Sequence, residues 1–148
     1  MGADLYINSI FSKNKEKFEP EFDKWVEKRN KAQSKEEKDK CQEKVVKFYD
    51  KMNKIGYFRD SYNNSNLLWM LNLDYWSWFK SFLDKNNRLS PKKAKILVKE
   101  LKERKIVFDN KKELLKKDWV DYFEKSFKEL TEFLETAIDL NESIECSI

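Results

Sequence analysis

Residues 56–69 of the chain read GYFRDSYNNSNLLW. This stretch contains no lysine, although the chain has 31 lysine and arginine residues, and it begins with one of only two glycines. Its middle combines Arg59, Asp60 and asparagines with aromatic residues that can close over polar groups and lower the local dielectric. We therefore predict a central loop here, and we take this loop as the candidate functional site.

The segments on either side of this stretch have the pattern of amphipathic helices. Apolar residues recur at three- and four-residue steps in residues 14–29 and 35–55, and a longer stripe of the same kind runs through residues 111–141. Only two glycines and two prolines are present, whereas an all-β chain of this length needs many more turn residues. The sequence therefore predicts a mainly helical protein.

Capping residues mark the ends of these helices. Ser34 followed by Glu37 has the pattern of a capping box, and Ser90 followed by Pro91 places a polar cap before a proline at the first helical position. The other predicted N-caps are Ser65 or Asn66, Asp74 and Asn110. Pro20 is expected near the start of the first helix, and Gly56 is expected to end the second helix in the left-handed conformation.

Both ends of the chain alternate between apolar and polar residues, as short strands do. Leu5 and Ile7 alternate with polar neighbours near the start, and residues 144–148 repeat the pattern at the end. Two isolated short strands are marginal alone, so we expect them to pair. Residues 106–108 are predicted as a buried connector or an edge strand. The predicted fold is a single domain, residues 1–148, with five to six helices and a small β-ribbon formed by the N- and C-terminal segments.

Charge and hydropathy restrict the class of partner. The formal net charge of +4 comes from 31 basic and 27 acidic residues that are interleaved, and only four of the basic residues are arginine, so we do not expect nucleic acid as the partner. No apolar run is long enough to span a bilayer, and the N-terminus has no secretory signal, so we expect a cytosolic protein without a membrane partner. Cys41 and Cys146 lack a CxxC spacing and are expected to be reduced, buried thiols.

Catalytic signatures are absent from the sequence. The chain has no histidine, which is the commonest general base at neutral pH and the commonest zinc ligand. It has no GxxxxGK[ST], GxGxxG or GxSxG motif for phosphate, dinucleotide or acyl-transfer chemistry. We therefore predict a protein that is not an enzyme, with no catalytic residues, no metal and no cofactor.

Two interpretations of the central stretch remain open. Arg59 and Asp60 could form a partly enclosed pair that binds a polar ligand, or Asp60 could act as an acid or base if its pKa were perturbed. Alternatively, Asp60 and its polar neighbours satisfy the loop backbone while the aromatic residues fill the core. Tryptophans at these positions belong to the core or, where they are exposed, to an interface. The candidate binding residues are Asp4, Tyr6, Arg59, Asp60, Tyr62, Asn63, Asn64, Trp69, Trp76 and Trp78.

Three segments of the chain carry a resemblance to other proteins. Gly2–Tyr6 reads GADLY, the centre reads GYFRDSY at Gly56–Tyr62 with NLLW at Asn66–Trp69, and the tail Ile144–Ser147 reads IECS. Together these segments resemble a group of small uncharacterised proteins of bacteria and their phages. The resemblance implies no catalytic residues. It implies a mobile-element setting, in which small proteins often bind a host protein, including components of antiviral defence.

The expected function is therefore a small cytosolic protein that binds a host protein and inhibits or modulates it. The binding surface would come from the central stretch and from the aromatic segment at residues 69–82, because aromatic residues are favoured at interfaces. One alternative is an enzyme or small-ligand receptor that uses the Arg59/Asp60 loop. Another is a weak nucleic-acid binder driven by the lysines.

Overall fold

The computed structural model describes residues 2–62 and 65–148. The chain divides into two compact units. Unit 1 combines Met1–Ile7 with Tyr57–Ile148, and unit 2 is Asn8–Gly56. Along the chain, unit 2 is thus an insertion between the first two strands of unit 1. The expectation of a single domain across residues 1–148 stays a prediction.

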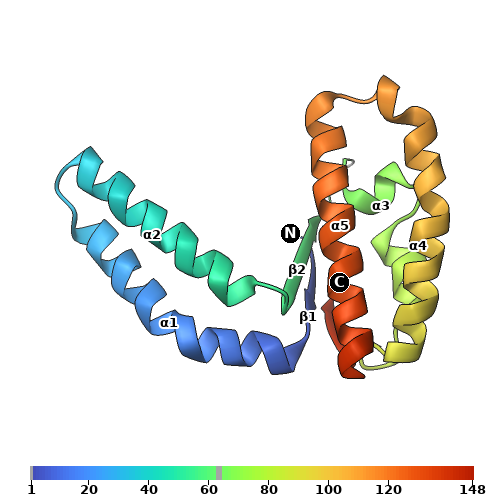
Figure 1. Cartoon of the computed structure of the whole chain (residues 1–148), viewed down its shortest axis with the longest axis horizontal. Helices are drawn as coiled ribbons and strands as arrows, with labels where there is room; N and C mark the ends of the chain where they lie inside the picture. The colour runs from blue at the N-terminus through green and yellow to red at the C-terminus, as the bar shows by residue number, and fades with distance from the viewer. Residues whose placement is uncertain (1, 63–64) are drawn as a thin grey trace. The chain divides into compact units, whose positions relative to one another are not determined.

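Unit 1 contains an antiparallel sheet with the strand order β2-β1-β4-β3. Strands β1 and β2 lie side by side in Figure 1. The strands are β1 (Gly2–Tyr6), β2 (Tyr57–Ser61), β3 (Arg88–Leu89) and β4 (Ile144–Ser147). The predicted pairing of the two chain ends is confirmed, with Leu5 of β1 opposite Cys146 of β4. The ends form the centre of a wider sheet because β2, which the sequence predicts as a loop, pairs with the other side of β1.

Helices supply the rest of unit 1, so the predicted mainly α fold is confirmed. They are α3 (Leu67–Met70), η1 (Tyr75–Phe79), η2 (Lys80–Phe82), α4 (Pro91–Lys111), η3 (Lys112–Leu114) and α5 (Lys117–Leu140). The buried face of the sheet carries Ala3, Leu5, Phe58, Ile144 and Cys146. Phe58 meets Phe133 of α5 at a centroid distance of 6.3 Å, so α5 packs on this face. None of the helices in the described ranges is long and apolar enough to cross a membrane.

Residues 106–108 lie inside α4, so the connector and the edge strand predicted there are both wrong. Phe108 is fully buried and stacks on Phe123 of α5 at a centroid distance of 3.7 Å. This contact extends the packed face of α4 by about two turns beyond Leu101, and the helix continues to Lys111. Asn110 is therefore a helical residue, and the N-cap predicted for it is also wrong.

The other predicted N-caps form as the sequence suggests. Ser34 and Ser90 each accept a hydrogen bond from the backbone N–H three residues later, at 3.1 and 3.2 Å. Asn66 caps α3 through the N–H of Trp69 at 2.8 Å, and Asp74 caps η1 through the N–H of Ser77 at 2.6 Å. These side chains satisfy backbone donors that a helix start leaves without partners.

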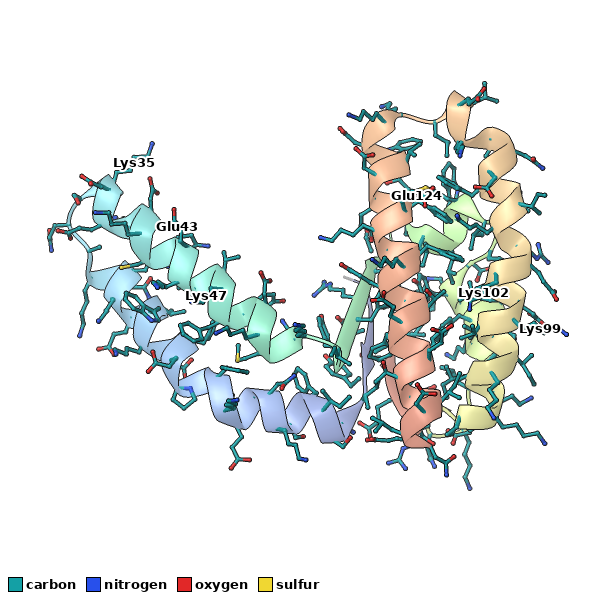
Figure 2. All side chains as sticks on the ribbon, viewed as in Figure 1. Lys35, Glu43, Lys47, Lys99, Lys102 and Glu124 are labelled. Atoms are coloured by element: carbon teal, nitrogen blue, oxygen red, sulfur yellow. The ribbon has the colours of Figure 1, made fainter. Side chains whose placement is uncertain are left out.

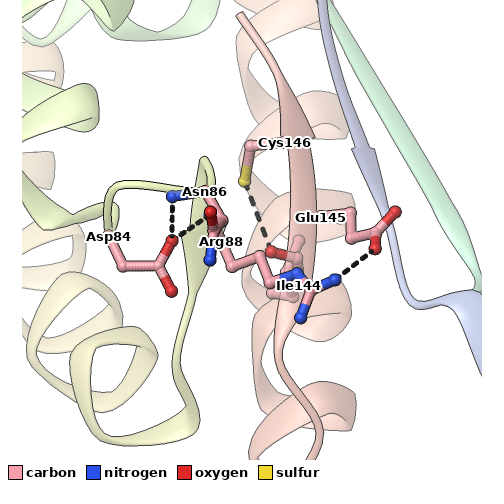
Figure 3. A network of polar contacts seen from close by, with 6 residues as sticks. All are labelled: Asp84, Asn86, Arg88, Ile144, Glu145 and Cys146. Carbon is pink, nitrogen blue, oxygen red and sulfur yellow. Dashed lines mark hydrogen bonds and ion pairs between the residues drawn. The ribbon is translucent and has the colours of Figure 1, made fainter.

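The connection into β3 is a polar turn that ends in a strand (Figure 3). Asp84 Oδ1 accepts hydrogen bonds from the backbone N–H groups of Asn86 and Arg88, at 2.8 and 3.0 Å. The Arg88 side chain then reaches Glu145 across the β3–β4 pair, with Nη2 3.4 Å from Oε1. The Asp84 carboxylate thus holds the turn in shape, and the ion pair between Arg88 and Glu145 links β3 to β4.

Unit 2 is an antiparallel hairpin of α1 (Asn8–Lys31) and α2 (Lys35–Asn53) (Figure 1). Helix α1 begins earlier than predicted, so Pro20 lies inside it and not near its start. A proline there removes one backbone hydrogen bond, and α1 bends along its length in Figure 1. The Cys41 side chain is half-buried on α2, not buried as predicted, whereas Cys146 in unit 1 is buried.

The turn after α2 differs from the predicted glycine cap. Ile55, not Gly56, has the left-handed backbone, with φ of 71°. The Gly56 N–H donates to the Lys54 carbonyl at 2.8 Å, which makes Ile55 the centre of a three-residue γ-turn. Gly56 is required for space, since a Cβ at this position would lie 2.7 Å from the backbone nitrogen of Phe11.

Candidate functional site

Asp60 is a fully buried carboxylate at the centre of unit 1. Its Oδ1 accepts hydrogen bonds from the Ser61 N–H at 2.9 Å and from the Tyr122 hydroxyl at 2.5 Å. Its Oδ2 accepts from the Leu67 N–H at 3.0 Å and from the Tyr75 hydroxyl at 2.5 Å. Each oxygen therefore receives one backbone donor and one tyrosine hydroxyl. This arrangement connects β2, α3, η1 and α5 through a single side chain.

Burial changes the ionisation of this group of residues. The pKa of Asp60 is raised because burial penalises its charged form, although the hydrogen bonds from Tyr122, Tyr75, Leu67 and Ser61 act in the opposite direction. Burial and the bond to Asp60 raise the pKa of Tyr122 to about 12, and burial and the charge of Asp60 raise the pKa of Tyr75 well above its usual value. Both tyrosines are therefore neutral hydroxyl donors at physiological pH.

One set of aromatic rings extends from this network to the surface. Tyr75 meets Tyr62 edge-on at a centroid distance of 6.3 Å, and Tyr62 meets Trp76 at 5.1 Å. Tyr75 is buried, Tyr62 is half-buried, and Trp76 is 60% exposed. Asp60 thus fixes Tyr75 through a hydrogen bond, and Tyr75 packs on Tyr62. Tyr62 in turn packs on the exposed ring of Trp76.

A second pair of rings lies next to Tyr122, whose own side chain is 37% exposed. Trp119, about one helical turn before Tyr122 on α5, packs perpendicular to Trp69 of α3 at a centroid distance of 5.9 Å. Trp69 is 40% exposed, and the ammonium group of Lys111 lies 5.4 Å from the centre of its ring. We call Tyr62, Trp69, Trp76, Trp119 and Tyr122 the aromatic surface of unit 1.

A separate polar group occupies the opposite face of the sheet. Asp4 accepts a hydrogen bond from the Tyr57 hydroxyl at 2.5 Å, and its Oδ1 lies 3.8 Å from Arg59 Nε. Tyr6 packs on Tyr57 with ring centroids 5.2 Å apart. The cross-strand register explains the group, because Asp4 lies opposite Arg59 and Tyr6 lies opposite Tyr57.

The structure separates Arg59 from Asp60. Successive residues of a strand point to opposite faces, so Arg59 is exposed while Asp60 is buried. The two side chains therefore do not form the ligand-binding pair that their adjacency suggests. Asp60 instead serves the backbone and the core, as in the alternative interpretation of the central stretch.

The other predicted site residues divide between these groups. Asp4 and Tyr6 lie on the sheet face with Arg59, whereas Tyr62, Trp69 and Trp76 belong to the aromatic surface. Trp78 lies outside both groups and packs on Phe82 at a centroid distance of 5.1 Å. Asn63 and Asn64 lie outside the described residues.

Four residues of these groups are absent from the candidates that the sequence suggests. They are Tyr57, Tyr75, Trp119 and Tyr122. Trp119 and Tyr122 belong to the apolar stripe that predicts a helix in residues 111–141, so the sequence identifies them as packing residues. Only the tertiary fold brings Tyr122 to Asp60 and Trp119 to Trp69, and no local signal marks either contact.

The described residues contain no group of three or more histidine, cysteine, aspartate or glutamate side chains that could hold a metal ion. What the site offers chemically is a set of exposed and half-buried rings, with Lys111 over Trp69 and Lys116 over Trp119. Comparisons with protein-family models, with curated proteins and with solved structures find no match for this chain.

Proposed function

We propose that this chain is a non-enzymatic protein-binding protein that uses the aromatic surface of unit 1. In the mobile-element setting that the resemblance implies, its partner is a host protein, such as a defence component, that it inhibits or modulates. The observation that carries the proposal is the exposure of Trp69, Trp76 and Tyr122 on one unit. Large aromatic side chains are enriched at the energetic centres of protein interfaces.

The buried network supports this proposal through pre-organisation. Asp60 fixes Tyr75 and Tyr122, and Tyr75 in turn packs on Tyr62, the ring partner of Trp76. Rings that are already held in place lose little conformational freedom when a partner binds, so more of the contact energy appears as affinity.

The alternatives have less support from the geometry. Four donors of the protein itself already occupy both oxygens of Asp60, which favours a structural role over acid–base chemistry. One arrangement favours a nucleic-acid binder, because bases can stack on aromatic rings while lysines contact the phosphates. It consists of Lys111 over Trp69 and Lys116 over Trp119. This alternative is an outcome of the following test.

The test is affinity purification of the tagged full chain from its native host, with Trp69→Ala/Trp76→Ala as the test variant. Ile106→Ala is the control, since Ile106 is a comparably exposed large apolar residue of α4 outside the aromatic surface. We expect one host protein to be retained by the wild type and the control, and its affinity to fall by about 30-fold or more in the test variant. Equal recovery by all three proteins, or binding of an oligonucleotide with a steep salt dependence, would overturn the proposal.

A further inference from the structure

The net charge of the protein lies in unit 2. Residues 8–56 contain 14 lysine and arginine residues and 10 aspartate and glutamate residues, which accounts for the whole formal charge of +4. Unit 1 contains 17 residues of each sign. The hairpin is therefore a basic element attached to an electrically balanced one.

The hairpin also has an incomplete apolar core. Phe18 meets Phe48 at a centroid distance of 6.4 Å, and Phe22 meets Tyr49 at 6.2 Å. No side chain of α1 is buried, and only Val45 and Met52 are buried on α2. Two helices form a single layer, which leaves the rings between them partly open to solvent. We call Phe18, Phe22, Trp25, Phe48 and Tyr49 the hairpin seam.

Lysines lie over this seam. Lys28 and Lys44 place their ammonium groups 4.5 and 5.9 Å from the centre of the Trp25 ring. Lys51 lies 5.5 Å from the ring of Phe18 and 5.3 Å from that of Phe48. Their aliphatic stems cover apolar surface while their charges stay in water.

These lysines differ from others on the same helices. Lys15, Lys31 and Lys40 pair with glutamates one turn away. Among the ion pairs of the described residues, none involves Lys28, Lys44 or Lys51. Their charges are therefore available to carboxylates of a partner. Figure 2 shows how side chains of both signs, such as Glu43 and Lys47, line α2.

A shallow surface hollow of about 390 Å³ lies beside the turn of the hairpin. It is lined by Lys28, Lys31, Ala32, Glu37, Lys40 and Cys41. Small or apolar side chains thus lie beside lysines, and one of these lysines, Lys28, also covers Trp25.

We propose that unit 2 binds an acidic amphipathic helix of a partner protein. The apolar face of that helix would cover the seam, and its carboxylates would neutralise Lys28, Lys44 and Lys51. A second copy of the hairpin is disfavoured because it carries the same net charge. Nucleic acid is disfavoured by the 10 carboxylates and by the presence of a single arginine, Arg29, in this unit.

The probe for the test is a synthetic helical peptide with leucine on one face and glutamate at the other positions. The control peptide has the same leucines with lysine in place of glutamate. We expect the full-length protein to bind the acidic peptide at least about tenfold more tightly than the control, with an affinity that falls as salt rises. Equal binding of the two peptides would overturn the proposal, as would preferred binding of duplex DNA or of anionic vesicles.

The position of the bound peptide is tested through Cys41. This thiol is half-buried in the hollow, whereas Cys146 is buried and its pKa is raised to about 12 by burial, so maleimide should label Cys41 first. We expect saturating acidic peptide to slow the labelling of Cys41 by at least about tenfold. Peptide binding that leaves this rate unchanged would place the peptide elsewhere and overturn the proposal.

Variants complete the test. Lys28→Gln/Lys44→Gln should weaken peptide binding by about three- to tenfold, whereas Lys92→Gln/Lys99→Gln removes the same charge from α4 and should leave it unchanged. Circular dichroism checks that both variants keep their helices. Trp69→Ala/Trp76→Ala should bind the peptide like the wild type, which separates this proposal from that for unit 1. Equal weakening by both lysine pairs would show a nonspecific charge effect and overturn the proposal.

Discussion

At the scale of single residues, Asp60 is a buried acidic group that accepts hydrogen bonds from neutral donors. Its two oxygens accept four hydrogen bonds, two of them from backbone N–H groups that cannot reverse their direction. A tyrosine hydroxyl can rotate to accept a bond, but an N–H group only donates. The position therefore requires two acceptor atoms, which among side chains of this size only a carboxyl group provides.

We predict that Asp60→Asn lowers the free energy of unfolding by about 1–3 kcal/mol. The amide nitrogen must face one of the two backbone N–H groups, so two donors oppose each other in a buried site. Asp121→Asn, on the exposed side of α5, is the control and should change stability by less than about 0.5 kcal/mol. Urea unfolding measures both variants, and similar values for the two would contradict the structural role of Asp60.

The raised pKa of Asp60 predicts a pH dependence. The folded protein keeps a proton on Asp60 at pH values where the unfolded chain, with a pKa of 3.8, has lost it. Stability from this group therefore rises as the pH falls through the folded pKa, and it levels off below the unfolded value. We expect the difference in unfolding free energy between wild type and Asp60→Asn to grow from about pH 7 to about pH 4. A difference that shrinks over this range would contradict the direction of the shift.

Replacing Ile55 should stabilise the protein, whereas replacing Asp60 should destabilise it. A β-branched residue at φ of 71° is strained, and the side chain is about half exposed, so its removal loses little burial. Ile55→Gly should raise the free energy of unfolding by about 1 kcal/mol. Ile55→Ala keeps a Cβ and should gain less. Thermal unfolding distinguishes the two, and a less stable glycine variant would show that the isoleucine side chain outweighs the strain.

At the scale of elements, packing against α5 stabilises the last turns of α4. Phe108 stacks on Phe123, whereas Ile106 on the same turn is 61% exposed. Phe108→Ala should therefore lower the free energy of unfolding by about 3–5 kcal/mol. Ile106→Ala should lower the free energy of unfolding by less than about 0.5 kcal/mol. Denaturant unfolding of both variants measures this contrast, and equal effects would contradict the helical packing of residues 106–108.

At the scale of the whole molecule, burial is distributed unevenly between the two units. Helix α5 buries Phe123, Leu130, Phe133 and Leu134, whereas no side chain of α1 is buried. Local opening should therefore be easier in the hairpin than in the core of unit 1. We expect amide hydrogens of α5 to exchange at least about tenfold more slowly than those of α1, as measured by mass spectrometry. Equal protection would indicate that the two units open together.

The sequence alone was sufficient for the parts of this protein that depend on local interactions. The stripes of α1, α2 and α5, the caps at Ser34 and Ser90, and the alternation at both chain ends arise from residues within a few positions of each other. These signals predict the mainly α fold and the pairing of the ends.

Only the tertiary structure determined the central stretch and the sites. Residues 57–61 form a strand because β1 is available to pair with them, and that pairing sends Arg59 and Asp60 to opposite faces. The hydroxyl donors to Asp60 come from Tyr75 and Tyr122, which lie 15 and 62 residues away, so no local pattern could identify them. The open seam of the hairpin is likewise a property of two helices packed in a single layer. Hydrogen bonds and burial between segments that are distant in the sequence form only when the tertiary fold brings those segments together. They therefore depend on the whole fold and not on local sequence patterns.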